Sequence, residues 1–126
     1  MKKILIVIAD YYEDISSSLL KSAKYELNNF SLKVIKVPGV FEIPVTISKN
    51  IKKYDAFIAL GCVIKGETPH FDFISSASIH AIMNLSVESK KPIGNGIITC
   101  LNMKQAKARG KKGKEAAQAV VSVLSQ

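Results

Sequence analysis

The order of apolar patterns along this 126-residue chain constrains its fold more than any other feature. Short apolar runs at 4–8, 32–37, 55–60 and 92–98 are typical of strands, and the first is uninterrupted, as in a strand covered on both faces. Each run precedes residues with helical periodicity, at 15–27, 44–51, 70–87 and from 102 onward. This alternation predicts an α/β fold of three layers, α/β/α, with a four-stranded parallel sheet and helices on both faces.

Length and composition favour a single domain over residues 1–126. Hydrophobic residues make up 48% and charged residues 22%, which is typical of a globular chain rather than a disordered one. The apolar share is high for such a small domain, so we expect apolar surface to be buried between subunits. No apolar run approaches the roughly 18 residues of a membrane-spanning helix, so no membrane partner is expected.

The first ten residues indicate the compartment. Two lysines and an apolar run faintly resemble a secretion signal, but Asp10 ends the run early and no cleavage site follows. The chain has two cysteines, Cys62 and Cys100, too few for a disulfide framework. We therefore expect a cytoplasmic protein.

The net charge of +8 suggests an anionic partner. Six basic residues fall within 104–114, but Arg109 is the only arginine, and lysine cannot read guanine in a bidentate manner. A small phosphate ester is therefore favoured over nucleic acid, which we do not expect as a partner. A basic, polyanion-binding protein remains the alternative from a different functional class.

Ligands of parallel α/β sheets bind beyond the carboxyl ends of the strands. The segment 61–70 is the richest of these ends, because Gly66 allows close backbone approach and Thr68-Pro69 are suited to start a helix. Its amides would form an anion site, and His70 would lie beside it in the first helical turn. There the helix dipole favours a neutral imidazole that can accept a proton. The alternative is a capped helix with an exposed histidine.

Other strand ends carry weaker signals. Glu42 lies in the segment 38–44, where two prolines and a glycine fix a rigid turn, and it can accept hydrogen bonds from a polyol or stabilise a helix start. Tyr11 can stack on a heterocycle or cover the sheet edge. Arg109 with Lys112 can clamp a phosphate or form a solvated basic surface. No histidine accompanies Cys62 in a triad pattern, and His70 and His80 would face different sides of one helix, so neither a thiol nucleophile nor a metal site is expected.

Three blocks resemble the signatures of the 6,7-dimethyl-8-ribityllumazine synthase family. They are Pro-Gly-Val-Phe-Glu-Ile-Pro at 38–44, Gly-Cys-Val-Ile-Lys-Gly-Glu-Thr-Pro-His-Phe at 61–71 and Pro-Ile-Gly-Asn-Gly-Ile-Ile-Thr at 92–99. The resemblance implies condensation of 5-amino-6-(D-ribitylamino)uracil with 3,4-dihydroxy-2-butanone 4-phosphate, without cofactor or metal. It also implies a homo-oligomer, a pentamer with active sites between subunits.

The resemblance implies roles for individual residues. His70 would be catalytic and move protons during imine formation and phosphate loss. Tyr11 would stack on the pyrimidine, and Val40, Phe41 and Glu42 would hold the ribityl chain. Glu67 and Thr68 would contact the phosphate, and Arg109 with Lys112 would reach the phosphate of a neighbouring subunit's site. The other substrate-binding residues would be Cys62, Val63, Ile64 and Asn95.

Three departures from the family pattern affect these expectations. The chain starts almost at its first strand, which favours a free pentamer over a larger shell. The stretch between Arg109 and Lys112 is shorter than usual, so Lys111 is an alternative to Lys112. Asn95 replaces a phenylalanine that usually covers the pyrimidine, which predicts weaker binding. Two alternatives stay close to this family: a non-catalytic relative that binds flavin or lumazine, and an archaeal-type riboflavin synthase.

Overall fold

A computed structural model describes residues 1–126 of the chain. The strands are β1 (Lys3–Ala9), β2 (Ser31–Val37), β3 (Ala56–Ile64) and β4 (Ile93–Cys100). The helices are α1 (Glu13–Tyr25), α2 (Ile43–Lys49), α3 (His70–Ser89), α4 (Met103–Lys107) and α5 (Lys112–Leu124), with a short 3-10 helix, η1 (Val40–Glu42), before α2.

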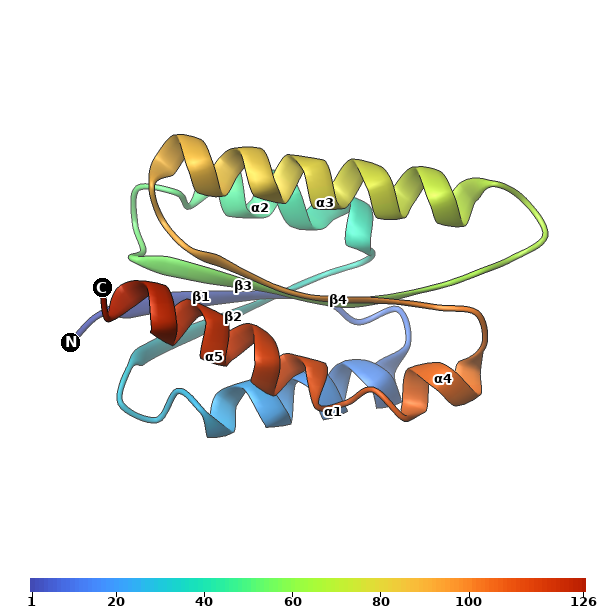
Figure 1. Cartoon of the computed structure of the whole chain (residues 1–126), viewed down its shortest axis with the longest axis horizontal. Coiled ribbons are helices and arrows are strands. Elements are labelled where there is room, and N and C mark those ends of the chain that lie inside the picture. Colours follow the sequence, from blue (N-terminus) through green and yellow to red (C-terminus); the bar gives the residue numbers. More distant parts are fainter.

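The four strands form one parallel sheet in the order β2-β1-β3-β4. Figure 1 shows α2 and α3 on one face of this sheet and α1, α4 and α5 on the other. The three-layer α/β/α architecture predicted from the alternating pattern is therefore confirmed.

The hydrophobic core has two halves, one on each side of the sheet. Ile4, Ile6 and Ile8 of β1 pack in the half that contains α1 and α5, whereas Leu5 and Val7 pack in the half that contains α2 and α3. All five side chains are buried. Burial on both faces explains why the sequence of β1 is apolar without interruption.

Several boundaries differ by a few residues from the sequence prediction, and two of these differences concern the segment 61–70. The third strand does not end at residue 60: β3 continues to Ile64, because residues 61–64 pair with residues 97–100 of β4. The long helix α3 does begin at His70, but Pro69 is its N-cap residue, one position later than predicted for Thr68. Residues 61–63 are therefore buried strand residues rather than part of a loop.

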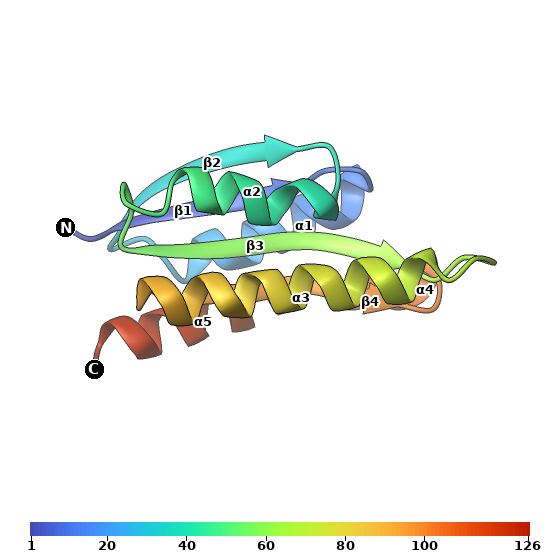
Figure 2. The same ribbon diagram turned by 90° about the horizontal axis from the view of Figure 1, so that it is seen from above.

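The sheet has a switch point between β1 and β3. These strands are neighbours, yet the chain leaves β1 toward α1 on one face and leaves β3 toward α3 on the other (Figure 1). Such a divergence leaves a crevice at the carboxyl ends of the two strands. Figure 2 shows the connection between β3 and α3 projecting beyond this end of the sheet.

The contact between α1 and α5 requires glycine at position 113. A Cβ atom there would overlap the Leu19 carbonyl oxygen and lie 2.6 Å from Ser22 Oγ. Alanine ordinarily stabilises a helix by about 1 kcal/mol relative to glycine, but overlap with backbone costs about 1–3 kcal/mol. We expect Gly113→Ala to lower the free energy of unfolding by up to about 2 kcal/mol.

Urea unfolding at a fixed protein concentration measures this change. Gly66→Ala is the matched control, because a Cβ at position 66 meets no atom within 4 Å. Equal stability of the Gly113→Ala variant and the wild-type protein would contradict the prediction.

Candidate active site

A cavity of about 380 Å³ opens at the carboxyl ends of β1 and β3. Its lining is mainly apolar: Tyr11, Tyr12, Gly39, Val40, Phe41, Cys62, Val63, Ile64, His70 and Ile74. The cavity thus occupies the switch point, where parallel α/β sheets bind their ligands. Seven of the residues proposed from the sequence lie together here: Tyr11, Val40, Phe41, Cys62, Val63, Ile64 and His70.

A close contact between η1 and β3 shapes one wall of this cavity. A Cβ atom at Gly61 would lie 2.8 Å from Val40 Cγ2 and 3.3 Å from Ala9 Cβ. Glycine at this position therefore allows η1 to pack directly on the strand. Val40 is buried by this packing, while the next residue, Phe41, is 70% exposed and faces outward at the cavity.

The rim of the cavity carries exposed aromatic rings. Tyr11 is 76% exposed, and its ring meets the Tyr12 ring edge to face at 4.9 Å. Burial raises the pKa of Tyr12, and the neighbouring Tyr11 adds to the shift, so the Tyr12 phenol stays neutral at physiological pH. Tyr11 and Phe41 thus offer apolar ring faces to a planar ligand.

His70 is the only ionisable imidazole in this lining and occupies the first position of α3. Its backbone N–H donates to Thr68 Oγ1 over a long 3.4 Å. Glu67 and Thr68 are exposed in the loop before the helix and do not line the cavity. The space beside Gly66 is open, so this loop leaves room for a ligand next to its backbone.

Glu42 lies at the edge of the cavity rather than in its lining. It is the N-cap residue of α2, and no hydrogen bond from its side chain caps that helix. Its carboxylate lies over Gly39, since a Cβ atom built there would be 3.3 Å from Glu42 Oε1. Because Gly39 lines the cavity, the carboxylate is next to the space that a polyol chain would occupy.

The remaining predicted residues, Arg109, Lys112 and Asn95, do not line the cavity of their own chain. Arg109 Nη1 donates to the Thr99 carbonyl oxygen at 3.2 Å, on the edge strand β4. Lys112 pairs with Glu115 at 3.6 Å on α5. Asn95 is exposed within β4, where it is paired in register with Ala59, and its Oδ1 accepts the Ile97 N–H at 3.1 Å.

Three lining residues were missing from the sequence-based site. Tyr12 is next to a predicted residue, and Gly39 belongs to the recognised turn at 38–44. Ile74 lies one helical turn after His70, and the i, i+4 spacing is the signal that would have identified it. Whether each of these three residues reaches the cavity depends on the direction of its local backbone.

The Cys62 thiol lies in the cavity wall but stays protonated, which is the unreactive form of a cysteine. Burial, followed by the nearby Cys100 thiol, raises the pKa of Cys62 to about 12. The thiolate fraction at pH 8 is therefore roughly 10³-fold lower than for an ordinary cysteine. We expect iodoacetamide to alkylate Cys62 slower by about this factor, with a rate that keeps rising as the pH approaches 12.

Peptide mapping by mass spectrometry distinguishes alkylation at Cys62 from that at Cys100, and the urea-unfolded protein is the control for full reactivity. Rapid modification of native Cys62 at pH 8 would contradict the assigned state. The raised pKa agrees with the expectation that no cysteine nucleophile acts here.

Comparison with known proteins identifies the family of this site. A sequence model of the 6,7-dimethyl-8-ribityllumazine synthase family matches residues 1–126, the entire chain. The chain belongs to this family. The lumazine synthase resemblance of the three sequence blocks is therefore confirmed, and two of these blocks, 38–44 and 61–71, supply most of the cavity lining.

Named relatives cover nearly the full chain. The 6,7-dimethyl-8-ribityllumazine synthase 1 of Rhodopseudomonas palustris is 45% identical over 136 aligned positions, covering 97% of this chain and 83% of the relative. The synthase of Agrobacterium fabrum is 42% identical, covering 96% of this chain and 91% of the relative. The alignment with the Rhodopseudomonas palustris synthase is longer than the 126 residues of this chain. The synthase therefore carries insertions with respect to this chain.

Proposed function

We propose that the cavity at the β1–β3 switch point forms 6,7-dimethyl-8-ribityllumazine, and that the complete site lies between subunits of a cytoplasmic homopentamer. As a member of the lumazine synthase family, the chain is a transferase of riboflavin biosynthesis. The reaction joins 5-amino-6-(D-ribitylamino)uracil to 3,4-dihydroxy-2-butanone 4-phosphate and releases phosphate and water. The observation that carries the proposal is the convergence of His70 and the apolar lining in one cavity.

The chemistry requires little from the enzyme beyond positioning and proton transfer. The pyrimidine 5-amine attacks the ketone, and water leaves to give an imine. Loss of phosphate then leaves an enol that tautomerises to a carbonyl, and the ribitylamino nitrogen closes the ring on this carbonyl with loss of a second water. The substrate amine is itself the nucleophile, which agrees with a Cys62 thiol kept protonated. Holding two reactants in register supplies much of the rate, and His70 moves the protons.

Each substrate matches a part of the cavity. Tyr11 and Phe41 present exposed rings for the pyrimidine, and the Glu42 carboxylate beside Gly39 accepts hydrogen bonds from ribityl hydroxyls. The loop with Glu67 and Thr68, next to the open space at Gly66, receives the phosphate. His70 lines the cavity and directly follows this loop, at the start of α3.

The position of Arg109 supports a site shared between subunits. Its guanidinium lies at the edge strand β4, whereas the cavity lies between β1 and β3, and Arg109 is absent from the cavity lining. Arg109 is exposed and carries no carboxylate partner within 4.0 Å. It is therefore available to the cavity of a neighbouring chain, and Lys112 and Asn95 would approach that cavity from the same chain.

The surface of α3 supports oligomerisation. Apolar side chains lie on both sides of this helix: Ile82 is buried against the sheet, whereas Phe73, Met83 and Val87 are 60–69% exposed. Large apolar side chains exposed on one helix form a surface that a partner can bury. No helix of the chain, including the 20-residue α3, combines the length and apolar character that a membrane span needs.

Incubation of the purified protein with the two substrates tests the proposed reaction. We expect enzyme-dependent appearance of the absorbance and fluorescence of the lumazine above the slow uncatalysed condensation. Tight riboflavin binding by a folded oligomer without product would instead indicate a non-catalytic relative.

Light scattering at micromolar concentration tests the assembly. We expect a mass close to five times 13.7 kDa. A monomer would contradict the shared site, because Arg109 would then be absent from every cavity.

A further inference from the structure

A second cleft shares no lining residue with the β1–β3 cavity, and it is lined by Lys21, Lys107 and Lys114, to which the proposed reaction assigns no role. It has a volume of about 510 Å³ and lies between α1 and the segment that joins α4 to α5. It is lined by Ser18, Lys21, Ser22 and Tyr25 of α1 and by Lys107, Ala108, Gly110, Lys111 and Lys114. The lining contains four lysines and no carboxylate.

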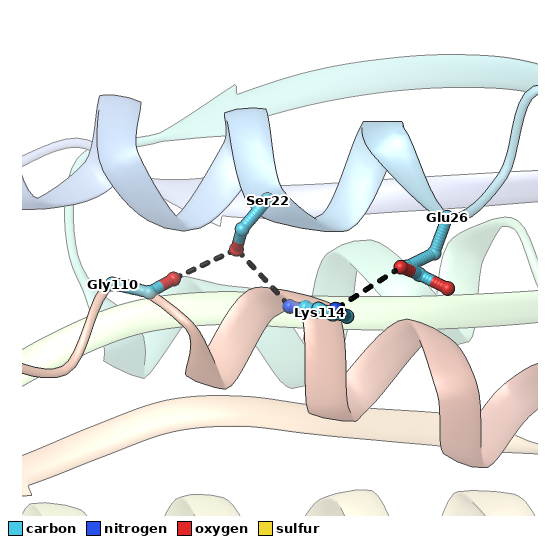
Figure 3. Close-up of polar contacts among 4 residues, drawn as sticks. All are labelled: Ser22, Glu26, Gly110 and Lys114. Atoms are coloured by element: carbon cyan, nitrogen blue, oxygen red, sulfur yellow. Dashed lines mark hydrogen bonds and ion pairs between the residues drawn. The ribbon is translucent and has the colours of Figure 1, made fainter.

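The two walls of this cleft are fixed to each other by hydrogen bonds. Ser22 Oγ donates to the Gly110 carbonyl oxygen at 2.7 Å and accepts the Lys114 N–H at 3.0 Å. Figure 3 shows Ser22 between these two groups and the Lys114 ammonium directed at the Glu26 carboxylate. The ammonium nitrogen lies 3.7 Å from Glu26 Oε1. The close packing at Gly113 joins the same helices. The cleft is therefore preformed and does not depend on a ligand for its shape.

The charge of the cleft is largely uncompensated. Lys114 is paired with Glu26, but Lys21, Lys107 and Lys111 have no carboxylate oxygen within 4.0 Å. Glu13 and Asp14 border a separate hollow that also includes Lys107. Lysines that border one concave surface without carboxylate partners make its potential positive, and a ligand with several negative charges is attracted to it.

An aromatic ring adds a second element of recognition. Tyr25 lines the cleft and is 79% exposed, so the face of its ring is free to stack on a planar heterocycle. The cleft has the size of a small-molecule pocket rather than that of a long groove for a polymer. We infer that this cleft is a binding site for a nucleoside di- or triphosphate, with the phosphates among the lysines and the base on Tyr25.

Isothermal titration calorimetry of the intact oligomer with ATP, ADP, adenosine and inorganic tripolyphosphate tests this inference. We expect saturable binding that weakens from ATP to ADP, is absent for adenosine and decreases as salt is added. Lys21→Gln with Lys107→Gln should weaken ATP binding by about tenfold or more. Lys33→Gln with Lys36→Gln on β2 is the control with the same loss of charge, and it should bind ATP like the wild-type protein.

Tyr25→Leu separates the two elements of recognition. It should weaken ATP binding while leaving tripolyphosphate binding unchanged. ATP binding that survives in the Lys21→Gln/Lys107→Gln variant would place the nucleotide elsewhere and overturn the inference. Binding of a single-stranded RNA oligonucleotide without binding of ATP would also overturn it, in favour of a polymer-binding surface.

Discussion

Replacing His70 by alanine is expected to lower kcat by about 10²-fold while changing the KM of either substrate little. The imidazole is the only side chain of the cavity lining suited to move protons near neutral pH, because the Cys62 thiol and the Tyr12 phenol are both held protonated. The apolar walls that position the reactants remain in the variant, so the contribution of proximity is retained. Steady-state kinetics of lumazine formation, with each substrate varied in turn, measures this split.

His80→Ala is the matched control for the His70 substitution. His80 is the only other histidine; it lies ten residues further along α3, is exposed and does not line the cavity. Its replacement should leave kcat unchanged. An unchanged kcat in the His70→Ala variant would remove His70 from the reaction, and a loss confined to KM would make it a binding residue.

The fold was predictable because its two central strands, β1 and β3, are buried on both faces. β1 has no polar residue between Ile4 and Ala9, and a run of this kind fits few architectures other than a covered parallel sheet. The end of β3 was not predictable in the same way. Gly61 interrupts the apolar run and reads as a turn residue, whereas its actual role is to let Val40 approach the strand. That role depends on a contact between segments about twenty residues apart in sequence.

The cavity residues were predictable to the extent that they follow strand ends. Tyr11, Phe41 and His70 each come shortly after a predicted strand, and the topology brings them to one place. The choice between Lys111 and Lys112 was not predictable, since it depends on how α5 packs. The structure places Lys111 in the cleft beside α1 and Lys112 in an exposed pair with Glu115. Both lysines are exposed, so accessibility alone does not separate them.

Arg109 provides the sharpest test of a site shared between subunits. Loss of a charged hydrogen bond to phosphate costs about 1.5–3 kcal/mol, so Arg109→Ala should raise the KM for the butanone phosphate by about 10–100-fold. The KM for the pyrimidine should change little. An effect limited to the pyrimidine would assign Arg109 to the other substrate.

Hybrid oligomers then distinguish a shared site from a site within one chain. When His70→Ala and Arg109→Ala chains carrying different tags are co-expressed and purified through both tags, a cavity with intact His70 can face an intact Arg109 from its neighbour. Random mixing of equal amounts restores about a quarter of the sites. At low butanone phosphate concentration, the hybrid should therefore be several-fold more active than either parent oligomer. If both residues acted within one chain, no hybrid would contain an intact site, and its activity would not exceed the mean of the two parents.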